Sequence, residues 1–566
     1  MSVVKMLSDK VPTYHQENID TISTSTPTSD PEKVYEDAAV GANLELDENA
    51  LPPGYFRSKF FDPNITWVAL AYTLTSAVTL TIIGRVSDIF GRRWVFVGGA
   101  ALGVIGSIIA ATAQSVNTLI GATTILGIAA ATQLSYFYVM GELVPMKYRL
   151  AGNAFCYLFC IPGSGVAPLV SNAFIVYQPK VGWRGCYYVL IGIELASFLC
   201  WFFFYHPPTF RMKHGQQASV AEYIKKFDYV GTTLYTGGLL IFMMGLSWGG
   251  SVYPWASASV IATIVIGFAA LVAFVLWECF VDLKEPLVPM HIFSNYSWNA
   301  SVLLTGLGAS VYYAFAIVWP SMVAVLYSDG GVMASAALSS FVGLFITIGQ
   351  IVGGFVGKKI GHLKWQCVIG ITLGAICFGS MATCGVGTKA RASALVGVGV
   401  FFIGWTEGAA ITIVTLAAKD QFALGTSAGV AGSIRFLISS IASTVYSVIL
   451  ANRLATTIAA QVPSAVIAAG LPSSSVATFI SAFSVGASAF EGIPGLTPEI
   501  LAIGTSAYQH ANADAYRTVF FSNIAFSGVA IICSLLLPNV DHLLTGQVAA
   551  TLHEGRDEDH IAGEKA

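Results

Sequence analysis

The loop between two long apolar segments carries glycine, aspartate and arginine at spacings that could join two parts of a protein. Its sequence reads G-x-x-x-D-x-x-G-R-R and consists of Gly84, Asp88, Gly91, Arg92 and Arg93. The Asp88 carboxylate could pair with arginines of a neighbouring loop or accept hydrogen bonds from the amides of a helix N-terminus. Gly84 and Gly91 would let the backbone turn and approach a neighbour closely. We predict a latch, and the simpler alternative is a basic anchor at a membrane surface.

Three charged residues stand well inside apolar segments. A charge in the hydrocarbon of a membrane is costly, so it is usually paired or functional. Glu407 and Arg435 would lie at similar depths, roughly 12–15 Å from the same membrane side at the rise of an α-helix. They could pair across adjacent helices, either to fix packing or to serve function. Glu194 is a candidate proton carrier if unpaired, because a carboxylic acid in a low-dielectric site keeps its proton more readily. It is structural if it faces a serine or tyrosine of the bundle.

Polar and aromatic side chains in the same segments could line a pathway through the membrane. They are Tyr72, Gln133, Tyr136, Tyr138, Tyr312, Tyr313, Gln350 and Trp405. An amphipathic aromatic lining suits a bulky and mostly neutral ligand. Ordinary packing inside a helical bundle is the alternative for each of these residues taken singly.

The elements that must position these residues are membrane-spanning helices. The chain has 566 residues, 55% hydrophobic and 10% charged, with a mean hydropathy of +0.70, whereas soluble domains carry about 25% charged residues. Long uninterrupted apolar segments are typical of helices rather than of the alternating strands of a membrane barrel. The 56 glycines suit close helix packing in lipid. We therefore expect an all-α polytopic membrane protein.

Several classes of function lack support in the sequence. The loop GRVSDIFGRR, residues 84–93, is not a phosphate-binding loop, because it lacks the G-K-[ST] ending. The nine cysteines fall almost entirely in apolar segments and show no spacing typical of metal ligands or of a disulfide framework. No nucleophile triad is evident. We expect no enzymatic activity, no cofactor, no bound metal and no nucleic-acid partner.

About thirteen segments are long enough to cross a membrane as helices. They lie near residues 65–84, 94–113, 118–142, 150–176, 186–205, 229–249, 257–280, 298–326, 334–357, 365–385, 392–417, 427–451 and 516–537. Lysine and arginine concentrate in alternate loops, beginning with the loop of Arg85, Arg92 and Arg93. Since positive charge marks the cytoplasmic side, we predict that these loops are cytoplasmic.

The same pattern divides the chain into five parts. We predict a disordered tail at 1–60, a first helical bundle at 61–205, a cytoplasmic loop with two further helices at 206–290, a second bundle at 291–538 and a cytoplasmic tail at 539–566. Within the second bundle, residues 452–515 are Ala/Ser/Pro-rich. We expect this stretch to lie outside the cell as short helices over the outer face.

Six segments occur in an order that resembles the fungal trichothecene efflux pump family. They are LPPGYFRS (51–58), PNITWVALAYTL (63–74), GRVSDIFGRRW (84–94), GELVPMKYR (141–149), KFDYVG (226–231) and KEPLVPMHIF (284–293). That family belongs to the fourteen-helix drug:proton antiporters of the major facilitator superfamily and is related to siderophore–iron transporters. The loop at 84–93 is similar to the signature loop between helices 2 and 3 of such transporters.

The resemblance implies the major facilitator fold, with two six-helix halves, two linker helices at about 229–280 and a mid-membrane cavity. It implies a monomer of the plasma membrane that exports toxins or other small molecules in exchange for protons. The latch would then close the cytoplasmic side while the pathway is open outward. A siderophore–iron transporter is the alternative, although an iron-loaded siderophore calls for a more polar and more highly charged cavity.

The first helix of that fold has no counterpart in this sequence. The family places it between its LPPGYFRS-like and PNITW-like segments, but here Phe61 is followed almost at once by Pro63. About forty residues, a helix and its flanks, would be absent through splicing or an error in the gene prediction. The odd number of spans would put the N-terminal tail outside. The chain could then be a transport-inactive isoform or a sensor.

Further positions depart from the family pattern. The drug antiporters carry an arginine four residues before a glycine in the helix of 119–131, where this chain has Thr123 before Gly127. The proton relay that this arginine supports in relatives is therefore in question. The antiporter motif of the next helix is only echoed by IPGSGVAP at 161–168, whose prolines and glycines predict a kink.

Overall fold

A computed structural model describes residues 66–207, 210, 219–250, 253–328, 331–418, 423–485 and 487–546. This part of the chain is helical, and its β-type pairing is limited to two isolated bridges. The predicted tail at 1–60 and the residues beyond 546 lie outside the described residues.

Thirteen helices of the described chain are long and apolar enough to cross a membrane, so the predicted all-α fold and the number of spans are confirmed. They are α3 (Thr66–Phe90), α4 (Arg93–Thr112), α5 (Val116–Gln133), the broken helix α7 (Arg149–Cys160) and α8 (Ala167–Tyr177), α9 (Arg184–Phe204), α12 (Tyr229–Trp248), α13 (Ala258–Phe280), α14 (Tyr296–Leu326), the adjoining α15 (Gly331–Ser339) and α16 (Phe341–Ile360), α17 (Leu363–Met381), α18 (Lys389–Ala417), α19 (Leu424–Ala468) and α21 (Pro498–Leu536). Shorter helices are α6 (Tyr136–Leu143), α11 (Val220–Lys226) and α20 (Val476–Val485).

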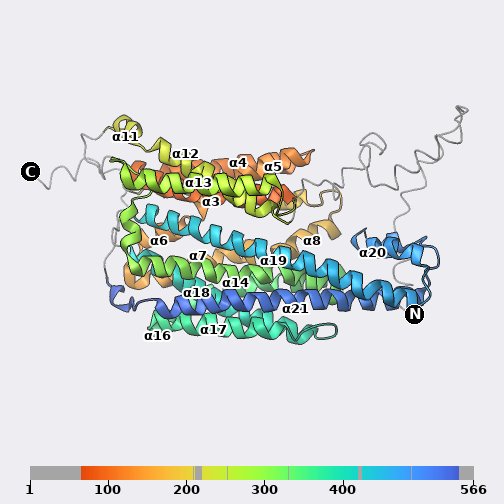
Figure 1. Cartoon of the computed structure of the whole chain (residues 1–566). Helices are drawn as coiled ribbons and strands as arrows, with labels where there is room; N and C mark the ends of the chain where they lie inside the picture. The colour runs from red at the N-terminus through yellow and green to blue at the C-terminus, as the bar shows by residue number, and fades with distance from the viewer. Residues whose placement is uncertain are drawn as a thin grey trace, which may run out of the picture. The chain divides into compact units, whose positions relative to one another are not determined.

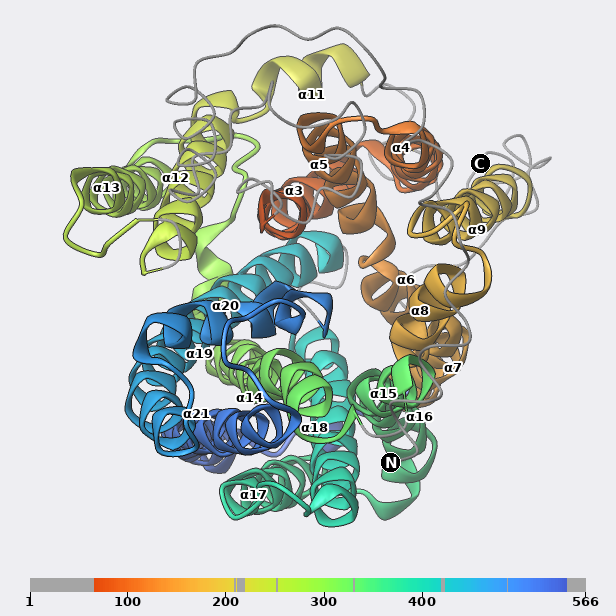
Figure 2. The same ribbon diagram turned by 90° about the vertical axis from the view of Figure 1, so that its right-hand side faces the viewer.

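The spanning helices form a first group, α3 to α9, and a second group, α14 to α21, joined in sequence by the pair α12 and α13. Figure 1 shows the long helices α14, α18, α19 and α21 running along one another. The two groups meet where α3 packs against α19 and where α7 packs against α16. The helix α12 packs on α13 and also contacts α3 and α19, so the pair stands beside the first of these junctions (Figure 2).

Short polar side chains fix the start of several helices. Ser115 Oγ accepts a hydrogen bond of 3.1 Å from the Thr118 amide at the start of α5. Asp228 Oδ1 accepts one of 2.8 Å from the Gly231 amide at the start of α12. These side chains satisfy backbone donors that have no partner within the first turn of a helix.

The two groups differ in how deeply their helices are buried. In the second group α14 packs against α18, α19 and α21, and 72% of its apolar stretch is buried. The last two spans of the first group are α7–α8 and α9, and only 6% of the apolar stretch of each is buried. The last two spans of the second group, α19 and α21, bury 28% and 33% of theirs. The described chain thus has five spanning helices in the first group and six in the second. The predicted loss of the first helix concerns the chain before Thr66, which lies outside the described residues, and it stays a prediction.

The helix of residues 149–177 is interrupted where a kink was predicted. The α-helix α7 ends at Cys160, a π-helical turn covers Ile161–Gly165, and α8 begins at Ala167. Pro162 cannot donate a backbone hydrogen bond, so the regular pattern fails there. The predicted kink is confirmed.

The stretch 452–515 differs from the prediction of short helices alone. Residues 452–468 form the last part of α19, which ends at Ala468, and residues 498–515 form the first part of α21, which begins at Pro498. The two extensions are joined by a hydrogen bond of 2.8 Å from Gln461 Nε2 to Asp514 Oδ2. Together with α20 they bury an apolar cluster around Phe479, and this packing offsets the weak helix signals of the sequence.

Candidate functional site

The predicted charged pair joins α18 to α19. Arg435 Nε donates a hydrogen bond of 2.9 Å to Glu407 Oε1, and Nη2 of the same guanidinium also contacts that oxygen. The Glu407 side chain is 2% exposed and the Arg435 side chain 24% exposed. A buried carboxylate without a counter-charge is strongly destabilising, so the contact with Arg435 offsets the cost of burying Glu407 and fixes its position.

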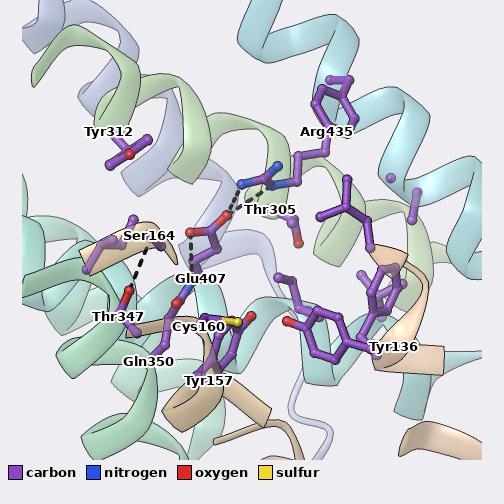
Figure 3. A pocket seen from close by; sticks show the side chains of 18 of the residues that line it. Tyr136, Tyr157, Cys160, Ser164, Thr305, Tyr312, Thr347, Gln350, Glu407 and Arg435 are labelled. Carbon is purple, nitrogen blue, oxygen red and sulfur yellow. Dashed lines mark hydrogen bonds and ion pairs between the residues drawn. The ribbon is translucent and has the colours of Figure 1, made fainter. Parts of the chain in front are cut away.

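A cavity of about 330 Å³ lies between the two groups of helices and contains this pair. Gln350 of α16 donates from Nε2 to Glu407 Oε2 at 3.3 Å, so the carboxylate is held from two sides (Figure 3). The wall of this central cavity comes from both groups and includes Tyr136, Tyr157, Cys160 and Ser164 from the first and Thr305, Tyr312, Tyr313 and Thr347 from the second.

The chemistry of the central cavity favours a mostly neutral ligand. Among the described residues that line it, Glu407 and Arg435 alone carry charge, and their charges balance. Tyr136 and Tyr157 meet edge to face with their ring centroids 5.8 Å apart. Aromatic walls with a few fixed polar groups bind ligands that are largely apolar and carry a few hydrogen-bonding atoms.

The predicted latch loop connects the first group to the second. Asp88, near the end of α3, accepts hydrogen bonds from the amides of Gly425 at 3.2 Å and Thr426 at 2.6 Å, in the first turn of α19. A carboxylate at this end of a helix is stabilised by the helix dipole. Arg92 donates to Asp88 at 2.9 Å and also pairs with Glu142, and it is 1% exposed. The aspartate therefore contacts both the arginine of its own loop and the backbone of the other group.

The other residues of the loop shape this junction. A Cβ atom on Gly84 would lie 3.0 Å from the carbonyl carbon of Gly425 and 3.2 Å from the Cα of Gly429, so α3 and α19 can touch only because this residue lacks a side chain. Gly91 has a φ of +93°, a conformation that glycine adopts readily. Arg93 donates to the Phe202 carbonyl at 2.8 Å and so acts within the first group.

Glu194 and Gln133 lie together, away from the central cavity. Gln133 Nε2 donates to Glu194 Oε2, which joins α5 to α9. The carboxylate sits against α4, where a Cβ atom on Gly103 would lie 2.6 Å from Oε2. Neither residue lines the central cavity. The amide partner, rather than a serine or tyrosine, satisfies this buried acid.

Two other predicted lining residues lie elsewhere. Trp405 donates from Nε1 to Gln366 Oε1 at 3.0 Å and packs at Gly353, between α16, α17 and α18. Tyr72 is 39% exposed on α3 and is not part of the cavity wall. The Tyr138 side chain lies outside the described residues. Of the predicted lining set, Tyr136, Tyr312, Tyr313 and Gln350 meet Glu407 and Arg435 in the cavity.

Sequence reasoning missed Tyr157 and Glu142. Glu142 belongs to the segment GELVPMKYR, and its charge beside a basic loop was a usable signal for pairing with Arg92. Tyr157 is flanked at equal spacing by Phe155 and Phe159, which are 54% and 73% exposed. The sequence gives no sign which of these three rings faces inward, because packing alone decides it.

Two helical groups that enclose a mid-membrane cavity and are latched on one side define a membrane transporter, in which the binding site lies between two mobile halves. The family described as "Fungal trichothecene efflux pump (TRI12)" matches residues 60–565, and the chain belongs to this family of major facilitator transporters.

Individual relatives cover most of the chain. The trichothecene efflux pump TRI12 of Trichoderma arundinaceum is 27% identical over 88% of this chain and 83% of its own length. The MFS-type transporter prx5 of Penicillium rubens is 32% identical over 78% of this chain and 80% of its own. Among solved structures, the human organic anion transporter MFSD10 (TETRAN) aligns with a TM-score of 0.44 at 13% identity, over 90% of this chain and 91% of that one.

Proposed function

We propose that this chain exports bulky, mostly neutral toxins of the trichothecene kind across the plasma membrane in exchange for protons. The observation that carries the proposal is the balanced Glu407–Arg435 pair inside an aromatic cavity between the two groups of helices. The family supports export, since relatives with similarity over most of the chain are named trichothecene efflux pumps. The volume of about 330 Å³ falls in the range of small-molecule sites.

Glu407 is the candidate for the coupling carboxylate. A proton on Glu407 removes the negative charge that holds Arg435 and leaves the Gln350 amide with a weaker acceptor. The contact between α18 and α19 then loosens, and a ligand hydroxyl group that donates to the ionised Glu407 carboxylate loses its acceptor as well. Loss of the proton restores the pair. Proton and ligand thus compete for one site, which is the requirement for exchange.

The latch closes one side of the pathway, and the direction of export rests on the family. Asp88 holds the predicted cytoplasmic ends of α3 and α19 together. The alternative of siderophore–iron transport is disfavoured by the single balanced ion pair in the central cavity. The alternative of an inactive isoform rests on the five spanning helices described in the first group. Transport by the purified chain would exclude this alternative.

The test is uptake of a tritiated trichothecene into proteoliposomes that contain the purified full chain. With a lumen one pH unit more acidic than the outside, one-for-one exchange should accumulate the compound up to about tenfold. Glu407→Gln should abolish this accumulation but retain exchange of labelled for unlabelled compound. Glu278→Gln is the matched control, because Glu278 is a buried carboxylate of α13 that accepts from the Val288 amide at 3.1 Å, outside the cavity.

Equal accumulation with and without the pH gradient would overturn proton coupling. Gradient-driven accumulation that survives in Glu407→Gln would transfer the coupling role to another residue. No uptake or exchange by the wild-type chain would favour the inactive isoform.

A further inference from the structure

A second cavity, of about 430 Å³, lies between α3, α12, α14 and α19 and is not used in the function proposed above. Its wall is rich in hydroxyl groups. Those of α19 are Ser439, Ser440, Ser443, Thr444 and Ser447, and Thr73 of α3 and Ser247 of α12 add two more. None of the described residues that line this outer cavity is charged.

The hydroxyl groups of α19 are arranged by the helix itself. Ser439, Ser443 and Ser447 are four residues apart, so they lie above one another on one face. Ser440 and Thr444 form the neighbouring row. A helix face that only contacts lipid gains nothing from such a row, because a polar group in hydrocarbon needs a partner.

The hydrogen bonds of this wall leave capacity for a ligand. Thr73 donates to the Ala69 carbonyl at 3.1 Å and Thr444 to the Ser440 carbonyl at 2.9 Å, so their oxygens still have lone pairs that can accept. Ser439 is 3% exposed, and its Oγ has no hydrogen-bond partner. A buried hydroxyl without a partner is destabilising, and a ligand hydroxyl beside it would remove that cost.

The outer cavity adjoins the central one. Tyr313 and Phe436 line both. Along α19, Ser447 lies twelve residues beyond Arg435, which is about 18 Å at the rise of an α-helix. It lies away from the end of α19 that Asp88 holds. A molecule that moves from the central cavity away from the latch would therefore pass Tyr313 and Phe436 and meet the serine face.

We propose that the outer cavity is a second binding site, specific for a neutral molecule that carries several hydroxyl groups, and that the exported molecule occupies it after the central cavity. The order of occupancy rests on the proposed function, whereas the binding itself does not. An acyl chain of a lipid would leave the Ser439 hydroxyl without a partner, so it is a poor occupant. A charged ligand would find no counter-ion there.

The experiment measures binding to the full chain in phosphatidylcholine nanodiscs by equilibrium dialysis. The probes are a tritiated trichothecene triol and its triacetate, which can accept but not donate hydrogen bonds. The wild-type chain should bind two triol molecules. The variant Ser439→Ala with Ser443→Ala should weaken the second binding event of the triol about tenfold, since two hydrogen bonds are lost. The triacetate has no donor for the lone pairs of Thr73 and Thr444, so it should bind in the central cavity alone and the variant should leave its binding unchanged. Ser107→Ala with Ser301→Ala, two buried serines outside both cavities, is the matched control.

Thermal unfolding separates a lost contact from a damaged fold. Removing the unpartnered Ser439 hydroxyl should not lower the unfolding temperature of the ligand-free chain. One triol per wild-type chain, or unchanged binding by the variant, overturns the outer site. An equal loss for triol and triacetate overturns its specificity for hydroxyl groups. If two triol molecules bind but the proteoliposomes transport nothing, the proposed function fails and the outer site stands. If the proteoliposomes transport but no second triol molecule binds, the outer site fails and the proposed function stands.

Discussion

Asp88 and Thr426 are joined twice, although 338 residues separate them. One carboxylate oxygen of Asp88 accepts both the Thr426 amide at 2.6 Å and the Thr426 hydroxyl at 2.8 Å. Asp88 lies near the end of α3, the first described helix of one group, and Thr426 lies in the first turn of α19, the longest described helix of the other. This is a charge-assisted contact at a helix N-terminus. Opening that side of the transporter therefore requires breaking the hydrogen bonds of one side chain, Asp88.

Asp88→Asn should loosen the latch. An amide cannot accept as strongly as a carboxylate, and hydrogen bonds to a charged group contribute about 1.5–3 kcal/mol, so the opened population should rise tenfold or more. The native Cys160 lines the central cavity and reports this opening. Its labelling by an impermeant maleimide in inside-out vesicles, resolved by peptide mass spectrometry, should become about tenfold faster.

A matched carboxylate controls for general helix capping. Asp541 Oδ1 accepts from the Leu363 amide at 3.0 Å, at the start of α17 and outside the latch. Asp541→Asn should leave the labelling of Cys160 unchanged. The latch is contradicted if both variants label at the wild-type rate.

Gly84→Ala should destabilise the protein where the two groups of helices touch. The added methyl group would meet the backbone of Gly425 and Gly429, which cannot rotate away as a side chain can. Overpacking of this kind costs about 1–3 kcal/mol and should lower the unfolding temperature and speed the labelling of Cys160. Gly98→Ala, at a position with open space around its Cβ, should do neither. Equal stability of the two variants would mean that α3 and α19 are not in close contact.

Hydropathy and one loop motif were enough to predict the spans and one side of the latch. Length and apolar content identify helices in lipid without knowledge of their neighbours. Amides at a helix N-terminus were one of the two kinds of partner expected for Asp88, but the helix that supplies them was not predictable, because any sequence supplies such amides at a helix start. The extended helices α19 and α21 were missed for a related reason, since Val462 and Phe479 are buried only once 452–515 packs on itself.

The lining of the central cavity was predicted in part for physical reasons. Glu407 and Arg435 stand out because charge is rare in a membrane segment, and they meet. Trp405 and Glu194 are also polar residues in apolar segments, but they do not line the central cavity. Trp405 bonds to Gln366 and Glu194 to Gln133. A polar side chain inside a bundle must be satisfied, and the sequence does not say whether a ligand or a neighbouring helix does it.

Glu194→Gln should leave proton-driven accumulation within about twofold of wild type, because we expect a positioning role for this acid. A glutamine can still bond to Gln133 and keep α5 and α9 together. Glu194→Leu should instead lower the free energy of unfolding by about 1–3 kcal/mol, since Gln133 is then left without its partner. The measurements are the proteoliposome assay and thermal unfolding. A loss of the pH dependence in Glu194→Gln would restore Glu194 as a proton carrier.

The ion pair between Arg85 and Glu285, with a distance of 2.7 Å, should couple α3 to the segment that follows α13. The side chains are 12% and 20% exposed, so the pair is partly shielded from water. Arg85→Glu and Glu285→Arg should each slow transport, and the double variant should recover most of it. The matched control is the exposed pair Glu222 and Lys226 within α11, whose reversal should have no effect. Lack of recovery in the double variant would mean that each residue acts alone.

The thirteen spans of the described residues and the predicted cytoplasmic basic loops lead us to expect that Ser29, which lies outside the described residues, is outside the cell. Ser29→Cys and Ser251→Cys, the latter in a predicted outer loop, should both react with an impermeant maleimide on intact cells, whereas Ser219→Cys in a predicted cytoplasmic loop should react only after permeabilisation. The unsubstituted chain gives the background from its nine cysteines. Protection of Ser29→Cys with reaction of Ser251→Cys would mean that a further segment crosses the membrane before α3, which would supply the helix that the weakly buried α9 and α7–α8 lack.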